Sequence, residues 1–86
     1  MDQEAIFTLI KKNIALILPH LSLHALTIED SLRQLGANSI DRMEIIILTM
    51  QDLKVKVPLL EFGKASNIGE LIEIFSQHSS SQSLST

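Results

Sequence analysis

The sequence contains no cysteine, tryptophan or tyrosine, and only three of its 86 residues are phenylalanine. Without cysteine the chain can form no disulfide and no thiolate metal site, and it has no cysteine nucleophile. Basic residues are also few: 7 Lys and Arg against 10 Asp and Glu give a formal net charge of −3. Because nucleic-acid binding usually needs a basic surface or stacking rings, we expect no nucleic-acid partner.

The sequence also lacks any apolar run near the roughly 20 residues that span a bilayer. Its start contains acidic residues and is unlike a signal peptide. We therefore expect a cytoplasmic, monomeric protein without a membrane partner. Hydrophobic residues still make up 45% of the chain, which is enough for the core of one small domain. A chain of this length leaves little room for a closed substrate pocket.

Apolar residues recur at steps of three and four over residues 4–18, and this spacing predicts a helix that ends before Pro19. The polar residues 11–13 are expected on its outer face. A long loop over residues 20–38 follows. Within it, residues 30–36 have the pattern of a single helical turn, with an aspartate as cap and a glycine at the end. The leucines of this turn are expected to attach the loop to the core.

The next segment contains four consecutive apolar residues, 45–48, which by themselves would suit a buried strand. Methionine and polar neighbours on both sides extend the segment beyond strand length. We therefore predict a helix that begins at Asn38 or Ser39 and ends near Leu53. The Asn38 side chain can cap this helix, and Asp41 then lies favourably against its positive end.

The remaining sequence predicts one helical turn over residues 59–62 and a last helix that opens with a capping box of Asn67 and Glu70. The Ser-rich sequence that follows has little to bury, so we expect a domain over residues 1–78 and a disordered tail over residues 79–86. The fold class is then all-α: a small four-helix bundle with three longer helices, one short helix and a long first loop.

Few residues are arranged for conventional catalysis or metal binding. His20 and His24 are four residues apart, but they lie in loop-like sequence with no acidic residue placed to complete a metal site. Nothing in the sequence ties His78 to a serine nucleophile. We therefore expect no metal site and no catalytic residue, and interpret the protein as something other than an enzyme.

Ser39 stands at the start of the predicted second helix, where serine has two physical uses. It can cap the helix, which is a frequent role of this residue. A helix start also presents free amide groups and partial positive charge, so a phosphate ester on the hydroxyl would be well placed. Gly36 would let the chain turn sharply into the helix without crowding that hydroxyl. Local sequence leaves both interpretations open.

Residues 35–40, Leu-Gly-Ala-Asn-Ser-Ile, resemble the signature of acyl carrier proteins, in which Leu-Gly precedes Asp-Ser-Leu. Further matches lie at the family's spacing at residues 43–45, 57–58 and 67–71, so that the likeness covers residues 4–77. It implies that Ser39 receives 4′-phosphopantetheine from coenzyme A through a separate Mg²⁺-dependent phosphopantetheinyl transferase. The terminal thiol of that arm would then hold an acyl group. Asn38 and Ile40 depart from the usual Asp and Leu, which puts the preference of the transferase in doubt.

The second helix has more apolar residues than one small bundle can bury. One stripe, called the docking strip below, consists of Ile40, Met43, Ile47 and Met50. It is either an exposed partner surface beside Ser39 or part of a well-buried core. A second stripe of Ile46, Thr49 and Leu53 is expected to face the bundle. The residues that we expect to contact partners are Ile40, Asp41, Met43, Glu44, Ile47 and Met50.

Within the family, residues 36–47 look like the free-standing donor carrier proteins of bacterial polyketide β-branching cassettes. This resemblance implies an acyltransferase that loads malonyl and a ketosynthase-like enzyme that decarboxylates it to acetyl. It also implies a synthase resembling 3-hydroxy-3-methylglutaryl-CoA (HMG-CoA) synthase, which takes the acetyl group. Two alternatives stay open: a general acyl carrier for fatty acid or polyketide extension, and a helical interaction module in which Ser39 is only a cap.

Overall fold

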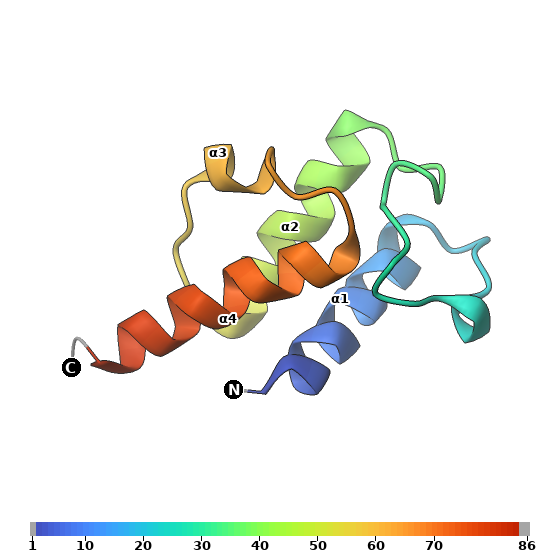
Figure 1. Ribbon diagram of the computed structural model, residues 1–86. Coiled ribbons are helices and arrows are strands. Elements are labelled where there is room, and N and C mark those ends of the chain that lie inside the picture. The colour runs from blue at the N-terminus through green and yellow to red at the C-terminus, as the bar shows by residue number, and fades with distance from the viewer. Residues whose placement is uncertain (1, 85–86) are drawn as a thin grey trace.

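The computed structural model describes the backbone of residues 2–84 and the side chains of residues 2–78. Its elements are helices α1 (Gln3–Ile17), α2 (Ser39–Leu53), α3 (Leu59–Phe62) and α4 (Ile68–Leu84), with a 3₁₀ turn, η1 (Leu23–Ala25), in the first loop. Within the described residues there is no strand, which confirms the all-α class. Figure 1 shows α4 crossing in front of α2, with α1 beside both and α3 in the connection between α2 and α4. None of these helices combines the length and the hydropathy needed to span a bilayer.

The core forms where α1 packs against α2 and α4. From α1 it receives Ile6, Ile10 and Ile14, which are almost fully buried as the spacing predicted. From α4 it receives the expected stripe of Ile68, Leu71, Ile72 and Phe75. The short helix α3 contributes Phe62, whose ring lies 5.0 Å from that of Phe75, centroid to centroid. This contact holds α3 against α4.

Asn13 is a correction to the sequence prediction, which placed it on the outer face of the first helix. Its side chain is 1% exposed and lies between α1 and α2. The amide Nδ2 donates to Thr49 Oγ1 at 2.9 Å and to Asp52 Oδ2 at 3.1 Å. Asn13 follows Ile6 by seven positions and Ile10 by three, so it belongs to their helical face. Its polarity, rather than its spacing, led to the wrong placement.

The first loop is held to the start of α4 by backbone hydrogen bonds. The amides of Ile68 and Gly69 donate to the carbonyls of Asp30 and Ile28, at 2.9 and 2.8 Å. These two amides belong to the free amide groups that every helix start must satisfy. The loop passes close to α4, and a Cβ at position 69 would lie 3.4 Å from the Ile28 carbonyl oxygen, which is ordinary van der Waals contact.

Two caps in these segments differ in detail from prediction. Asp30 does not cap the turn that follows it, since its carboxylate accepts from the Thr27 amide at 2.8 Å. The Ser31 hydroxyl instead accepts from the Gln34 amide at 3.0 Å. At the start of α4, Asn67 caps as expected, but Glu70 reaches the amide of the preceding residue, Ser66. Neighbouring polar residues compete for the same amides, and spacing alone does not decide between them.

The C-terminal helix is longer than the sequence predicted. α4 continues to Leu84, through residues for which a disordered tail was expected. Neither proline nor glycine occurs after Gly69, so the sequence contains no residue that breaks a helix there. Residues 85 and 86 lie outside the described residues, and the division into a domain and a tail stays a prediction.

Candidate functional site

Ser39 is the first residue of α2 and is exposed. The helix cap is its neighbour: Asn38 Oδ1 accepts from the Asp41 amide at 2.8 Å, and Asp41 Oδ2 accepts from the Asn38 amide at 3.3 Å. None of the hydrogen bonds between described residues uses the Ser39 hydroxyl. The structure therefore separates two roles that the sequence left together: Asn38 caps the helix, and Ser39 presents a free hydroxyl at its positive end.

The turn before α2 holds this hydroxyl in a defined place. Gly36 has a φ of 101°, a left-handed conformation that favours glycine. The amide of Ala37 donates to the Leu32 carbonyl at 3.0 Å, and the amide of Gly36 donates to the Arg33 carbonyl at 3.1 Å. This pair of bonds is the Schellman arrangement. Leu32 is buried and Leu35 packs against the core, so the two leucines anchor the turn as predicted, and Ala37 is buried beside them.

A side chain of α2 ties the same turn to the helix. Arg42 Nη1 donates to the Ala37 carbonyl at 3.1 Å and thus bridges the turn and the second turn of α2. Ser39 lies between these two fixed points. An arm attached to it would begin from a rigid base, which suits a residue that must be presented to other proteins.

The docking strip divides into an exposed part and a half-buried part. Ile40 and Met43, next to Ser39, are 68% and 41% exposed. Ile47 is half-buried, and Met50 packs against the core. The reason is geometric. The four residues of the strip are spaced by three, four and three positions, and over these ten positions the stripe rotates by about 80° around the helix axis. Its last member therefore approaches the bundle. The role of these residues as partner contacts stays a prediction.

The other residues expected around the docking strip are divided in the same way. Glu44 is exposed and Asp41 is half-buried, because the Asp41 carboxylate is part of the cap. Ile46 and Thr49 are buried as predicted for the bundle-facing stripe, and Ile45, which was assigned to neither stripe, is buried with them. The core-facing side of α2 is therefore wider than two stripes suggested.

Sequence reasoning missed an apolar surface on α3. Leu60 is 87% exposed and Leu59 is also exposed. A signal was present, since a single helical turn after Pro58 offers only one buried position, which Phe62 takes. Two adjacent leucines in such a turn must therefore face outward in part.

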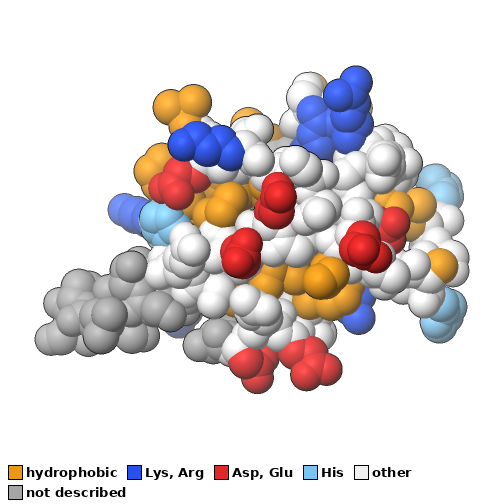
Figure 2. All heavy atoms as spheres, viewed as in Figure 1, with side chains coloured by type: hydrophobic (Ala, Val, Ile, Leu, Met, Phe, Trp, Pro, Cys, Tyr) orange, Lys and Arg blue, Asp and Glu red, His pale blue; other side chains and the backbone are white. Residues whose placement is uncertain are grey.

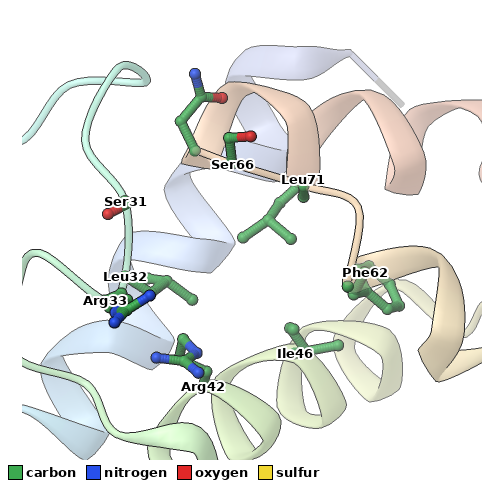
Figure 3. Close-up of a pocket in the computed structure, with 11 residues that line it drawn as sticks. Ser31, Leu32, Arg33, Arg42, Ile46, Phe62, Ser66 and Leu71 are labelled. Carbon is green, nitrogen blue, oxygen red and sulfur yellow. The ribbon is translucent and has the colours of Figure 1, made fainter.

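Sequence reasoning also missed a pocket of about 350 Å³ beside α2. It collects residues from the first loop, from α2, from α3, from the connection between α3 and α4, and from the first turn of α4. Figure 3 labels eight of them around one hollow. Arg42 and Ile46 supply the α2 wall. They follow Ser39 by three and seven positions, so the pocket opens on the Ser39 side of the helix. No sequence pattern pointed to it, because its walls are far apart along the chain.

The histidines lie away from Ser39. His20 and His24 are exposed in the first loop, and His78 Nε2 lies 3.1 Å from Glu61 Oε2, which links α4 to α3. Among the residues that the structure describes, no three His, Cys, Asp or Glu side chains come together as a metal site would require.

Comparison with known proteins assigns the chain to a family. Residues 8–75 match the family described as "Phosphopantetheine attachment site". The polyketide biosynthesis acyl-carrier protein AcpK of Bacillus subtilis (strain 168) is 45% identical over 74 residues, which cover 86% of this chain and 90% of AcpK. A chain from the crystal structure of the curacin-pathway HMG synthase in complex with acetyl donor-ACP superimposes with a TM-score of 0.82 and 40% identity. That match covers 90% of this chain and 99% of the other.

The site has the chemistry that this family requires. Its cofactor, 4′-phosphopantetheine, is attached covalently, and attachment needs a hydroxyl that is accessible and not engaged elsewhere. An exposed serine beside a capping asparagine meets that requirement, and the free amides at the start of α2 favour the phosphate. The match of fold, sequence and site leads to one conclusion: the chain belongs to the phosphopantetheine attachment-site family, as an acyl carrier protein.

Proposed function

We propose that Ser39 is the residue that carries the phosphopantetheine arm. The main support for this proposal is that Asn38 provides the helix cap, which leaves the exposed Ser39 hydroxyl without a structural role. A separate Mg²⁺-dependent transferase would join the Ser39 oxygen to the pantetheine phosphate of coenzyme A. The phosphoanhydride bond breaks in this step, 3′,5′-ADP leaves, and the serine proton passes to a base. The terminal thiol of the arm then binds acyl groups as thioesters.

The acyl group that we propose is malonyl, decarboxylated to acetyl and given to an HMG-CoA synthase-like enzyme in polyketide β-branching. Support comes from the two relatives, one described as a polyketide carrier and one as an acetyl donor in complex with an HMG synthase. Further support comes from Ile40 and Met43, which offer an apolar surface beside the attachment point. Each such side chain buried at an interface contributes roughly 1.5–3 kcal/mol before the costs of association.

In this proposal the polypeptide recognises partners and positions the arm, and the chemistry belongs to other proteins. Those partners are the phosphopantetheinyl transferase, an acyltransferase, a decarboxylating ketosynthase-like enzyme and the synthase. Catalysis by the chain itself is not part of the proposal. The monomeric state and the cytoplasmic location stay predictions.

Attachment is tested by incubation with coenzyme A and a broad-specificity phosphopantetheinyl transferase, followed by intact-protein mass measurement. Wild type is expected to gain the mass of one phosphopantetheine group, and Ser39→Ala none. Ser66→Ala is the matched control, because Ser66 is also exposed and its hydroxyl has no described hydrogen bond. Equal gain by Ser39→Ala would refute the assignment.

The donor role is tested by transfer of acetyl. We expect a β-branching synthase to accept acetyl from this protein at least tenfold faster than from a fatty acid carrier protein loaded in the same way. Transfer at equal rates would leave only the general carrier function.

A further inference from the structure

The pocket beside Ser39 has an unusual charge pattern for a chain with a net charge of −3. Two arginines, Arg33 and Arg42, line it, and no Asp or Glu does. Figure 3 shows both guanidinium groups on the same side of the pocket, one from the loop and one from α2. In Figure 2, Lys and Arg side chains gather over the start of α2, whereas the acidic side chains of this face lie lower.

Neither arginine of the pocket forms an ion pair with a described acidic residue. The ion pairs within residues 2–78 are Lys12–Asp52 and His78–Glu61, and neither involves an arginine. The Asp41 carboxylate accepts from the Asn38 amide, and the Glu70 carboxylate accepts from the Ser66 amide. Neither guanidinium group therefore has a carboxylate at ion-pair distance among the described residues, although both carboxylates keep their negative charge.

The two arginines are suited to receive an anion. Nη1 of Arg42 donates to the Ala37 carbonyl, and this hydrogen bond fixes the position of the guanidinium group. The other N–H donors of Arg42 remain available to a ligand. Arg33 is exposed, and its long side chain can adjust to a ligand. A guanidinium group binds a carboxylate through parallel N–H donors, which favours this anion over a neutral carbonyl.

One wall of the pocket is apolar and consists of Leu32, Ile46, Phe62 and Leu71, which are all nearly buried. The rest of the lining includes Ser31, Ser66 and Asn67 together with the arginines. A volume of about 350 Å³ is at the low end of ligand pockets, so the space suits a short group. A ligand that fits both parts has a short apolar segment and an anionic end.

We propose that this pocket binds the carboxylate end of a short dicarboxylic acyl group carried on the arm, with Arg33 and Arg42 as the anion-binding residues. The proposal rests on attachment at Ser39, because Ser39 shares a helix face with Arg42 and the arm can return along it. An acyl group without the carboxylate has no partner for the arginines. The pocket therefore distinguishes the carboxylated form of the cargo from its decarboxylated product, retaining the first and leaving the second free for a partner enzyme.

The test compares two cargoes of equal size and different charge. The ¹⁵N-labelled protein is loaded with amide-linked malonyl, or with amide-linked acetoacetyl, in which an uncharged methyl ketone replaces the carboxylate. The readouts are the Nε–H resonances of Arg33 and Arg42 and the methyl resonance of Ile46. We expect malonyl to shift all three relative to the unloaded arm, and acetoacetyl to leave the arginine resonances in place. Equal spectra for the two cargoes would overturn the proposal.

Variants then assign the effect to the arginines. Arg33→Gln is expected to reduce the malonyl-specific shift of Ile46 by about two- to fivefold, as the loss of one partly exposed ion pair would. Arg42→Lys keeps the charge and a donor for the Ala37 carbonyl but loses the planar pair of donors, so we expect a smaller reduction. Lys64→Gln removes an exposed positive charge outside the pocket and should change nothing. An equal reduction by Lys64→Gln would show general electrostatics instead of a site.

The phosphate of the arm is the other anion within reach, and the unloaded protein separates it from the carboxylate. If attachment of the arm alone already shifts Arg33 and Arg42, and malonyl adds nothing, the arginines bind the phosphate and the proposal is wrong. Failure of attachment at Ser39 is seen by mass before any of these spectra are recorded. The proposed function and this inference can therefore fail separately.

Discussion

The two ends of α2 use their polar side chains differently. Near its C-terminus, Thr49 accepts from Asn13 and donates to the Ile45 carbonyl, and Asp52 accepts from Asn13 and pairs with Lys12 at 3.0 Å. Near its N-terminus, the Ser39 hydroxyl is free, and neither Arg42 nor the neighbouring Arg33 of the first loop forms an ion pair with a described residue. Among the described side chains no buried nitrogen or oxygen is left without a partner, so the free groups all lie at the surface.

This difference separates groups that hold the fold from groups that are available to a ligand. A buried polar group without a hydrogen-bond partner costs its full desolvation energy. The polar side chains between α1 and α2, called the seam below, are Lys12, Asn13, Thr49 and Asp52. The buried groups of the seam must therefore all have partners. A surface group has no such constraint, because water satisfies it until a ligand arrives. Substitutions at the two ends should therefore affect different measurements: stability at the C-terminal end, and attachment or transfer at the N-terminal end.

The largest expected effect on stability is at the seam. Asn13→Ala removes both hydrogen bonds of the buried amide and should lower the free energy of unfolding by about 2–3 kcal/mol. The measurement is urea denaturation followed by circular dichroism. Ser39→Ala, at the other end of α2, should change it by less than about 0.5 kcal/mol. A comparable loss in Ser39→Ala would remove the contrast between the two ends.

The second prediction concerns the docking strip, where the residues of α2 change from partner surface near its N-terminus to core near its C-terminus. Met50→Asp puts a carboxylate against the core and should cost about 2 kcal/mol. Met43→Asp lies on the exposed part and should leave stability within about 0.5 kcal/mol while it slows acetyl transfer to the synthase at least tenfold. Thermal melting and a transfer assay on the same samples measure both. If Met50→Asp melts like wild type, the half-buried part of the strip belongs to the partner surface.

The third prediction concerns the turn that positions Ser39. Gly36→Ala forces a left-handed φ on a residue with a Cβ, and should cost about 1 kcal/mol. No atom lies within 4 Å of the added Cβ, so the cost comes from the backbone alone. Gly36→Asn is the matched control, because asparagine tolerates this conformation better and should lose less. Equal losses would point to a contact that the free space does not show.

Local signals explain why much of this arrangement could be predicted from the sequence. Pro19 ends a helix, Asn38 and Asp41 start one, and Gly36 allows a turn, and each of these effects needs only a few neighbouring residues. These local effects were enough to predict the start of α2 and the position of Ser39. The phosphopantetheine arm was predicted only from the family resemblance.

What could not be predicted depends on contacts between distant segments. The two hydrogen-bond partners of Asn13 lie 36 and 39 positions along the chain, and nothing in its neighbourhood indicates a buried amide. The pocket is lined by five segments, so Arg33 and Arg42 meet only after the bundle has formed. Whether Met50 is a surface or a core residue depends likewise on how α2 is rotated against the bundle.

The smallest expected effect is a pH dependence that arises at the seam. The hydrogen bonds from Lys12 and Asn13 hold the pKa of Asp52 below its usual value, against the opposing effect of partial burial. Because the folded-state pKa is the lower one, this contribution to stability is complete above the unfolded-state pKa of about 3.9 and is lost as the pH falls through the folded-state value. Asp52 is partly exposed, so solvent screening keeps the contribution below about 1 kcal/mol.

Asp52→Asn tests the origin of this dependence. The variant should lose part of the decline in stability that wild type shows as the pH falls below about 4, measured by urea denaturation at each pH. Glu44→Gln removes an exposed carboxylate from the same helix and should leave the decline as it is. A flatter profile in Glu44→Gln than in Asp52→Asn would mean that general surface charge, and not the closed hydrogen-bond seam, sets the acid response of this end of α2.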